Sequence, residues 1–156
     1  MELNLLENKL EELKKRYECE IISNIKILKI IPEEITKPKM DGTPGYALYK
    51  IPFKLSETPS NLWKEVFLQN WKNPSSFSTM HRPNIASINN NHLILDGTTL
   101  EEIENYHKKT LLECIEKTNQ DVEIYTKKEI EKEINELKKE IDFYLISRKK
   151  AELIKF

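Results

Sequence analysis

The strongest constraint on the fold is an apolar ridge at each end of the chain. In the expected helix 2–18, apolar residues recur at alternating steps of three and four: Leu3, Leu6, Leu10, Leu13 and Tyr17. The same steps recur near the C-terminus: Ile130, Ile134, Leu137, Ile141 and Tyr144. This is the spacing of a coiled-coil seam. A helix of two heptads is unstable alone in water, so each ridge needs something to pack against.

Between the ridges, residues 20–98 predict a ββαββ core. Residues 20–31 are rich in β-branched isoleucine, which favours a strand that ends at Pro32. Residues 46–55 alternate between apolar and polar side chains, which predicts a second strand. Because Pro52 has no N–H to donate, we expect this strand at a sheet edge, or Pro52 facing outward at a bulge.

The second half of the core begins with a predicted helix and ends with a predicted β-ribbon. Thr58 is the expected N-cap, with Pro59 at the first helical position, and the helix should run to about Trp71. Residues 76–96 predict the ribbon. Its turn is the run of three asparagines at 89–91, because asparagine tolerates positive φ.

A long helix is expected over residues 99–156, either continuous or broken near 119–126. Thr98 and Glu101 have the spacing of a capping box, which predicts its start. The fold class is therefore α+β, with a small, mostly antiparallel four-stranded sheet and a packed helix. An N-terminal helix over 1–19 and the C-terminal helix complete a single expected domain, 1–156.

Composition limits the classes of partner. The 156 residues contain 25 Lys and Arg against 26 Asp and Glu, a net charge of −1, which argues against a generally cationic nucleic-acid binder. A nucleic-acid role stays open as an alternative through local lysines and the basic tail. Its candidate residues are Lys50, Lys54, Arg148, Lys149 and Lys150.

The expected location is the cytoplasm. Two widely separated cysteines, Cys19 and Cys114, are typical of buried free thiols in a reducing compartment. The first residues carry acids and lack an apolar stretch, unlike a signal peptide. No run approaches 18 uncharged apolar residues, so we expect no membrane partner.

Signals for catalysis are sparse. We expect no metal site, because the three histidines show no HExxH spacing and the sequence has no CxxC. We expect no cofactor, because no glycine-rich phosphate loop is present. One polar group between apolar runs, His81 and Arg82 with Asp96, could act in acid–base or anion chemistry, which keeps a small enzyme as a second alternative.

The leading expectation follows from the ridges. They predict a non-enzymatic assembly or protein–protein interaction subunit, whose terminal helices pack on each other, on a second copy, or on a larger partner.

Overall fold

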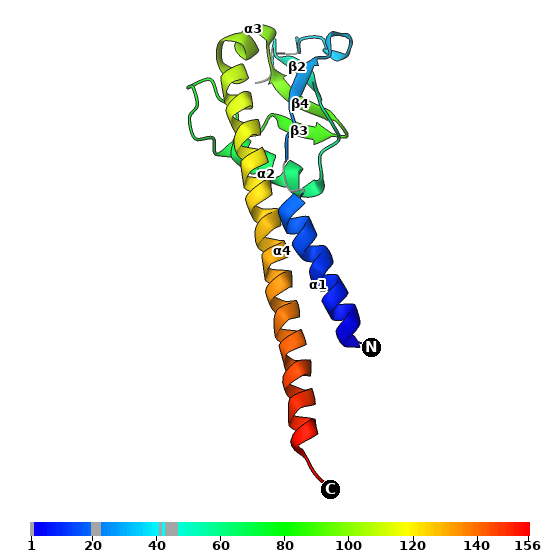
Figure 1. Cartoon of the computed structure of the whole chain (residues 1–156). Coiled ribbons are helices and arrows are strands. Elements are labelled where there is room, and N and C mark those ends of the chain that lie inside the picture. The colour runs from blue at the N-terminus through cyan, green and yellow to red at the C-terminus, as the bar shows by residue number, and fades with distance from the viewer. Residues whose placement is uncertain (1, 20–22, 41, 43–46) are drawn as a thin grey trace. The chain divides into compact units, whose positions relative to one another are not determined.

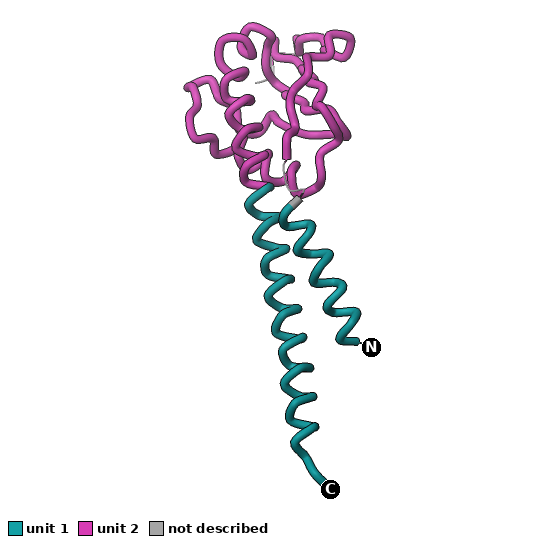
Figure 2. The backbone as a smooth tube through the Cα atoms, viewed as in Figure 1, with its two compact units in different colours: residues 1–22, 123–156 teal, residues 23–122 magenta. Residues whose placement is uncertain are grey.

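The computed structural model of the protein describes residues 2–19, 23–40, 42 and 47–156. Contacts divide the chain into two units, residues 23–122 and residues 1–22 with 123–156, shown in two colours in Figure 2. Each unit is described by itself. The predicted single domain stays a prediction.

Residues 23–122 contain a four-stranded antiparallel sheet and helices (Figure 1), which confirms the predicted α+β class. The strands are β1 (Ile27–Ile30), β2 (Tyr49–Leu55), β3 (Ala86–Asn89) and β4 (His92–Thr98), in the spatial order β1-β2-β4-β3. The helical elements are η1 (Pro32–Glu34), α2 (Asn61–Lys72), α3 (Leu100–Glu102), η2 (Ile103–His107) and the first part of α4 (Lys108–Leu153).

One face of the sheet forms the core. Alternation along β2 and β4 buries one row of side chains, Ile51, Phe53, Leu55, Leu93 and Leu95, at 3% exposure or less. The aromatic row of α2, Trp63, Phe67 and Trp71, packs in the same cluster as Ile103, Leu111, Cys114, Ile115 and Val122. The sheet is therefore covered on this face by α2 and α4.

Both predicted settings of Pro52 are wrong: β2 is not an edge strand, and Pro52 is buried and pairs in register with Ile94, away from the register shift between Tyr49 and Lys50. The strand lies inside the sheet, between β1 and β4, and not at an edge. Proline is tolerated there because β1 ends at Ile30, so Pro52 lies where the ladder with β1 ends. Its carbonyl still accepts a hydrogen bond from the backbone N–H of Ile31, at 3.0 Å.

The strand predicted over 20–31 is shorter than expected. Only Ile27–Ile30 pair as β1, residues 23–26 have no regular structure, and residues 20–22 lie outside the described part. The prediction of a longer strand counted Ile25 as one of the β-branched strand residues. In the structure Ile25 is buried in the core outside any strand.

Two helix starts lie one or two residues beyond their predicted positions. Ser60 caps α2 in place of Thr58, and its hydroxyl accepts a hydrogen bond from the backbone N–H of Trp63 at 3.2 Å. Thr99 caps α3 in place of Thr98, because Thr98 is the last, fully buried residue of β4.

The β-ribbon is confirmed in its second part only. β3 and β4 pair with Asn89 opposite His92, and Asn90 has the positive φ of 53° that the turn requires. Residues 76–81 are a loop and not a strand. Within it, Ser76 and His81 bond to a helix side chain and to a helix carbonyl, and neither bond belongs to a strand ladder.

The C-terminal helix is continuous through 119–126, since α4 runs unbroken from Lys108 to Leu153. Before it lies η2, a π-helical turn at Ile103–His107, in which the backbone N–H of Lys108 reaches back five residues to the carbonyl of Ile103.

Asn119 joins three segments of residues 23–122. Its side-chain oxygen accepts hydrogen bonds from Ser23 Oγ (3.0 Å), the backbone N–H of Ile25 (3.2 Å) and Trp63 Nε1 (2.8 Å). Its amide nitrogen donates to the carbonyl of Ile25 at 3.0 Å. One amide thus holds the segment before β1, the start of α2 and α4 together.

The other unit is a pair of antiparallel helices, α1 (Glu2–Cys19) and the second part of α4, drawn in teal in Figure 2. Leu13, Ile130, Ile134 and Leu137 form its buried cluster, and Leu6 and Leu10 pack against it. At the far end, the Tyr144 hydroxyl donates to a carboxylate oxygen of Glu2 at 2.9 Å.

We expect Asn119→Ala to lower the free energy of unfolding by about 2–4 kcal/mol, because Trp63 and Ile25 lose the acceptor for their N–H groups. Urea denaturation followed by tryptophan fluorescence measures this, since both tryptophans lie in residues 23–122. Gln120→Ala, at the exposed neighbouring position, should change stability by less than about 0.5 kcal/mol. Equal effects of the two substitutions would contradict the role of Asn119.

Candidate functional site

One polar group of residues 23–122 surrounds an ion pair between Arg82 and Glu102. Arg82 Nη1 donates to Glu102 Oε1 at 2.8 Å, and Nη2 lies 2.7 Å from Oε2. The second contact is close but is not aligned as a hydrogen bond. Arg82 Nη1 also donates to the carbonyl of Gly97 at 3.1 Å. The pair therefore links the loop before β3 to the end of β4 and the start of the long helix.

Two histidines lie against Trp71 beside this pair. The ring centroids of Trp71 and His81 are 4.5 Å apart, and those of Trp71 and His107 are 5.9 Å apart. His81 Nε2 lies 2.8 Å from the carbonyl oxygen of Trp71, so this nitrogen carries the proton. Trp71 Nε1 in turn donates to the carbonyl of Arg82 at 3.0 Å. We call Trp71, His81, Arg82, Glu102 and His107 the Arg82 cluster.

The Arg82 cluster sits at η2, because Glu102 precedes this π-helical turn and His107 ends it. Glu102 is 9% exposed and His107 is 1% exposed. π-helical turns are frequent at functional sites, so this position favours a site over a purely structural link. Two ring nitrogens in the cluster, His81 Nδ1 and His107 Nε2, are buried and have no hydrogen-bond partner in the part of the chain that the structure describes.

Burial and charge set the protonation of this cluster. Burial raises the pKa of Glu102, but the hydrogen bond and the charge of Arg82 outweigh it, so the net pKa lies below its usual value. Burial lowers the pKa of His107, and the positive charge of Arg82 adds to that effect against the opposing charge of Glu102. At neutral pH the cluster holds an Arg⁺–Glu⁻ pair next to a neutral imidazole.

The structure brings His81 and Arg82 close together but not Asp96. Asp96 is exposed on the sheet face away from the helices, where it lies opposite Lys50 in the β2–β4 ladder. Among the described residues, no hydrogen bond or ion pair joins its side chain to His81 or Arg82. The described contacts therefore do not join Asp96 to His81 and Arg82 in one acid–base site.

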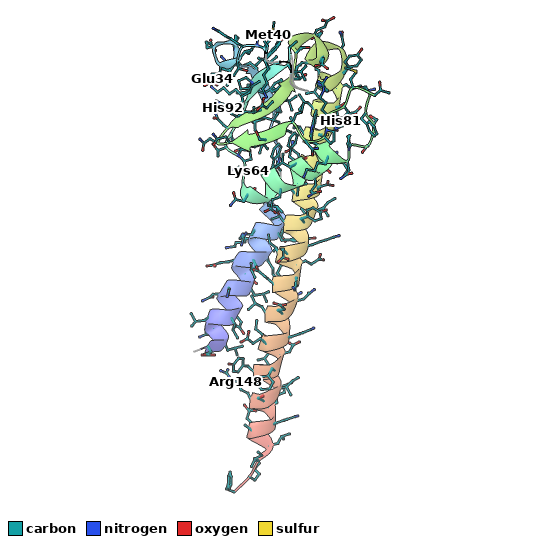
Figure 3. All side chains as sticks on the ribbon, turned by 180° about the vertical axis from the view of Figure 1, so that it is seen from behind. Glu34, Met40, Lys64, His81, His92 and Arg148 are labelled. Carbon is teal, nitrogen blue, oxygen red and sulfur yellow. The ribbon has the colours of Figure 1, made fainter. Side chains whose placement is uncertain are left out.

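His92 does not belong to the Arg82 cluster, which contains the other two histidines. His92 lies 3.9 Å from a carboxylate oxygen of Glu34, away from His81 (Figure 3). In the described ranges, no group of three or more His, Cys, Asp or Glu side chains is arranged to hold a metal ion.

The nucleic-acid candidates are divided between the two units. Lys50 and Lys54 share one face of β2, but Lys50 is half-buried beside Asp96. Arg148, labelled in Figure 3, Lys149 and Lys150 are exposed near the end of α4.

The ridge residues predicted as an interface pack within their own unit. Leu3, Leu13, Ile130, Ile134, Leu137 and Ile141 are buried, whereas Leu6, Leu10 and Tyr144 are half-buried and Tyr17 is exposed. Of the two cysteines, Cys114 is a buried free thiol whose pKa burial raises to about 11. The side chain of Cys19 lies outside the described part.

An apolar cavity of about 270 Å³ opens beside edge strand β1. Ile27, Ile30 and Phe53 line it from the sheet, and Ile103 and Leu111 line it from the helix side. Glu104 and Lys108 are the charged residues of its lining, so it suits an apolar group better than a charged one.

Sequence reasoning missed Glu102 and His107. Both lie in the stretch that follows β4, and Glu102 is three residues after Thr99, which is the capping-box spacing one step later than expected. The spacing of Thr99 and Glu102 could therefore have been used to predict this position of the helix start from the sequence. The π-helical turn that buries His107 left no recognisable pattern.

No known protein family, curated protein or solved structure matches this chain. Among the described residues, no helix combines the length and the hydropathy that crossing a membrane requires.

Lowering the pH should destabilise residues 23–122 in a window set by His107. Because its pKa is lower in the folded state, the unfolded chain takes up the proton first as the pH falls below about 6.5. Stability is therefore complete above that pH and decreases below it. Urea titrations between pH 7.5 and about pH 5 should show this slope, and His107→Phe should flatten it. A slope that is the same in both proteins would exclude His107 as its origin.

Glu102→Gln should cost about 2–3 kcal/mol at neutral pH, because Arg82 then stays in the interior without its counter-charge. The contribution of a carboxylate with a lowered pKa is complete above about pH 4.5 and is lost as the pH falls through that lowered pKa. The stability gap between wild type and Glu102→Gln should narrow below about pH 4.5. Glu101→Gln, at the exposed neighbouring position, is the matched control.

Proposed function

We propose that this chain is a non-enzymatic assembly subunit, which joins a protein partner or a second copy through its two terminal helices. The observation that carries the proposal is the exposed apolar surface of the helix pair. Phe143, Ile146 and Leu153 of α4 are exposed at 65%, 53% and 78%. Large apolar side chains grouped on one element are typical of interaction sites.

The small size of the helix-pair core supports the same proposal. Among the described residues, six of its apolar side chains are buried: Leu3, Leu13, Ile130, Ile134, Leu137 and Ile141. Helix pairs of this length gain little stability from packing alone, and further apolar contacts from a partner would add to it. We also propose that the apolar ridges of the two terminal helices pair as a coiled coil.

The enzyme and nucleic-acid alternatives gain less support. Asp96 lies apart from His81 and Arg82, and Lys50 lies beside an acid in an inner strand. We propose a cytoplasmic setting on the free, buried thiol of Cys114, which suits a reducing compartment.

The test is the molar mass and composition of the full chain purified from its native host. We expect a mass above that of the monomer, from self-association or from one stoichiometric companion. Phe143→Ser, Ile146→Ser and Leu153→Ser combined should reduce the mass to that of the monomer, because they remove the exposed apolar contacts.

The matched control replaces three exposed leucines of residues 23–122, Leu28, Leu62 and Leu112, by serine. This control should keep the assembly. A monomeric wild type without a companion, or an assembly that survives the α4 substitutions, would refute the proposal.

A further inference from the structure

The apolar cavity beside β1 combines a buried floor with an exposed mouth. It lies within residues 23–122 and has a volume of about 270 Å³. Three of its lining residues, Phe53, Ile103 and Leu111, are exposed at 4% or less. Water in an apolar space has few hydrogen-bond partners, so an apolar group that displaces it gains affinity. The floor therefore favours a ligand with an apolar part.

A β-bulge shapes the sheet side of the cavity. The register between β1 and β2 shifts between Ile27 and Lys29, and Leu28 is the extra residue of β1. In a regular strand, residues three positions apart face opposite sides of the sheet. The extra residue instead brings Ile27 and Ile30 to one face, where both line the cavity. β-Bulges are over-represented next to active sites.

The π-helical turn η2 shapes the helix side of the cavity. Ile103 and Glu104 belong to this turn, and Lys108 directly follows it. Such turns are frequent at functional sites. An irregular segment of backbone thus lines the cavity from each side. Two independent irregularities around one cavity favour a shaped binding site over a gap in the packing.

Two charges of opposite sign lie at the mouth of the cavity. Glu104 and Lys108 both line it and are exposed. Neither of them forms an ion pair with any other residue that the structure describes. A carboxylate accepts hydrogen bonds and an ammonium group donates them, so a hydroxyl group can bond to both. An anionic or a cationic ligand would instead meet one like charge.

The volume limits the length of the ligand. A group the size of a water molecule takes about 30 Å³ in a liquid, so 270 Å³ holds about nine such groups. We infer that the cavity binds an uncharged aliphatic alcohol of about nine carbon atoms, with its hydroxyl group at Glu104 and Lys108. This ligand site goes beyond the proposed assembly function, because it uses no residue of the two apolar ridges.

The first test titrates the full chain with straight-chain primary alcohols from butanol to dodecanol and follows binding by NMR. We expect one saturable site whose affinity rises about fourfold with each added methylene. The rise should level off at about nine carbon atoms, where the cavity is full. Absence of saturable binding, or an affinity that keeps rising up to dodecanol, would overturn the inference.

The second test compares octanol with octanoate and octylammonium at neutral pH. Octanol should bind more tightly than either ion, by about twofold or more. Glu104→Gln should strengthen the binding of octanoate, and Lys108→Gln should strengthen that of octylammonium, because each substitution removes the like charge at the mouth. If wild type prefers either ion to octanol, or if the two substitutions leave the preferences unchanged, the inferred place of the hydroxyl group is wrong.

A matched pair of variants tests the location of the site. Leu112 and Leu62 are both exposed on helices, at 53% and 39%, and Leu112 lines the cavity whereas Leu62 does not. Leu112→Trp should weaken octanol binding about tenfold and shift the plateau to shorter alcohols, because the larger ring takes up space in the cavity. Leu62→Trp should stay within about twofold of wild type. Equal octanol affinities in the two variants would place the binding elsewhere and refute the inference.

Discussion

Burial of one sheet face under aromatic side chains is the interaction on which residues 23–122 depend. A four-stranded sheet must cover one face to be stable, and here Trp63, Phe67 and Trp71 fill the space between β2, β4 and α4. Indole nitrogens placed this deep need acceptors. Asn119 provides one for Trp63, and the carbonyl of Arg82 provides the other for Trp71. The polar links of this unit, including the Arg82 cluster, are thus arranged around the aromatic core.

The sequence predicted the elements that depend on local periodicity. The step of four from Trp63 to Trp71, the alternation along β2 and the three asparagines between β3 and β4 each describe one element, and each element is present. The position of β2 inside the sheet could not be predicted in this way. Tolerance of Pro52 depends on where the neighbouring strand ends, which is a property of the sheet and not of the proline.

The candidate site shows the same division. His81 and Arg82 were singled out as adjacent polar residues, but their partners Glu102 and His107 come from a helix some 20 residues further along the chain. Asp96 is close to them in sequence, but strand alternation turns it to the opposite face.

The π-helical turn before α4 has a consequence for every residue that follows it. A turn that closes over five residues accommodates one residue more than an α-helical turn, and one residue corresponds to about 100° of rotation. The insertion thus sets the rotational phase with which Leu111, Cys114 and Ile115 meet the sheet. Shortening Ile103–His107 by one residue would leave Leu111, Cys114 and Ile115 in the chain, but it would rotate them by about 100° away from the sheet. The extra residue in this turn is therefore as much a part of the core as the side chains it orients.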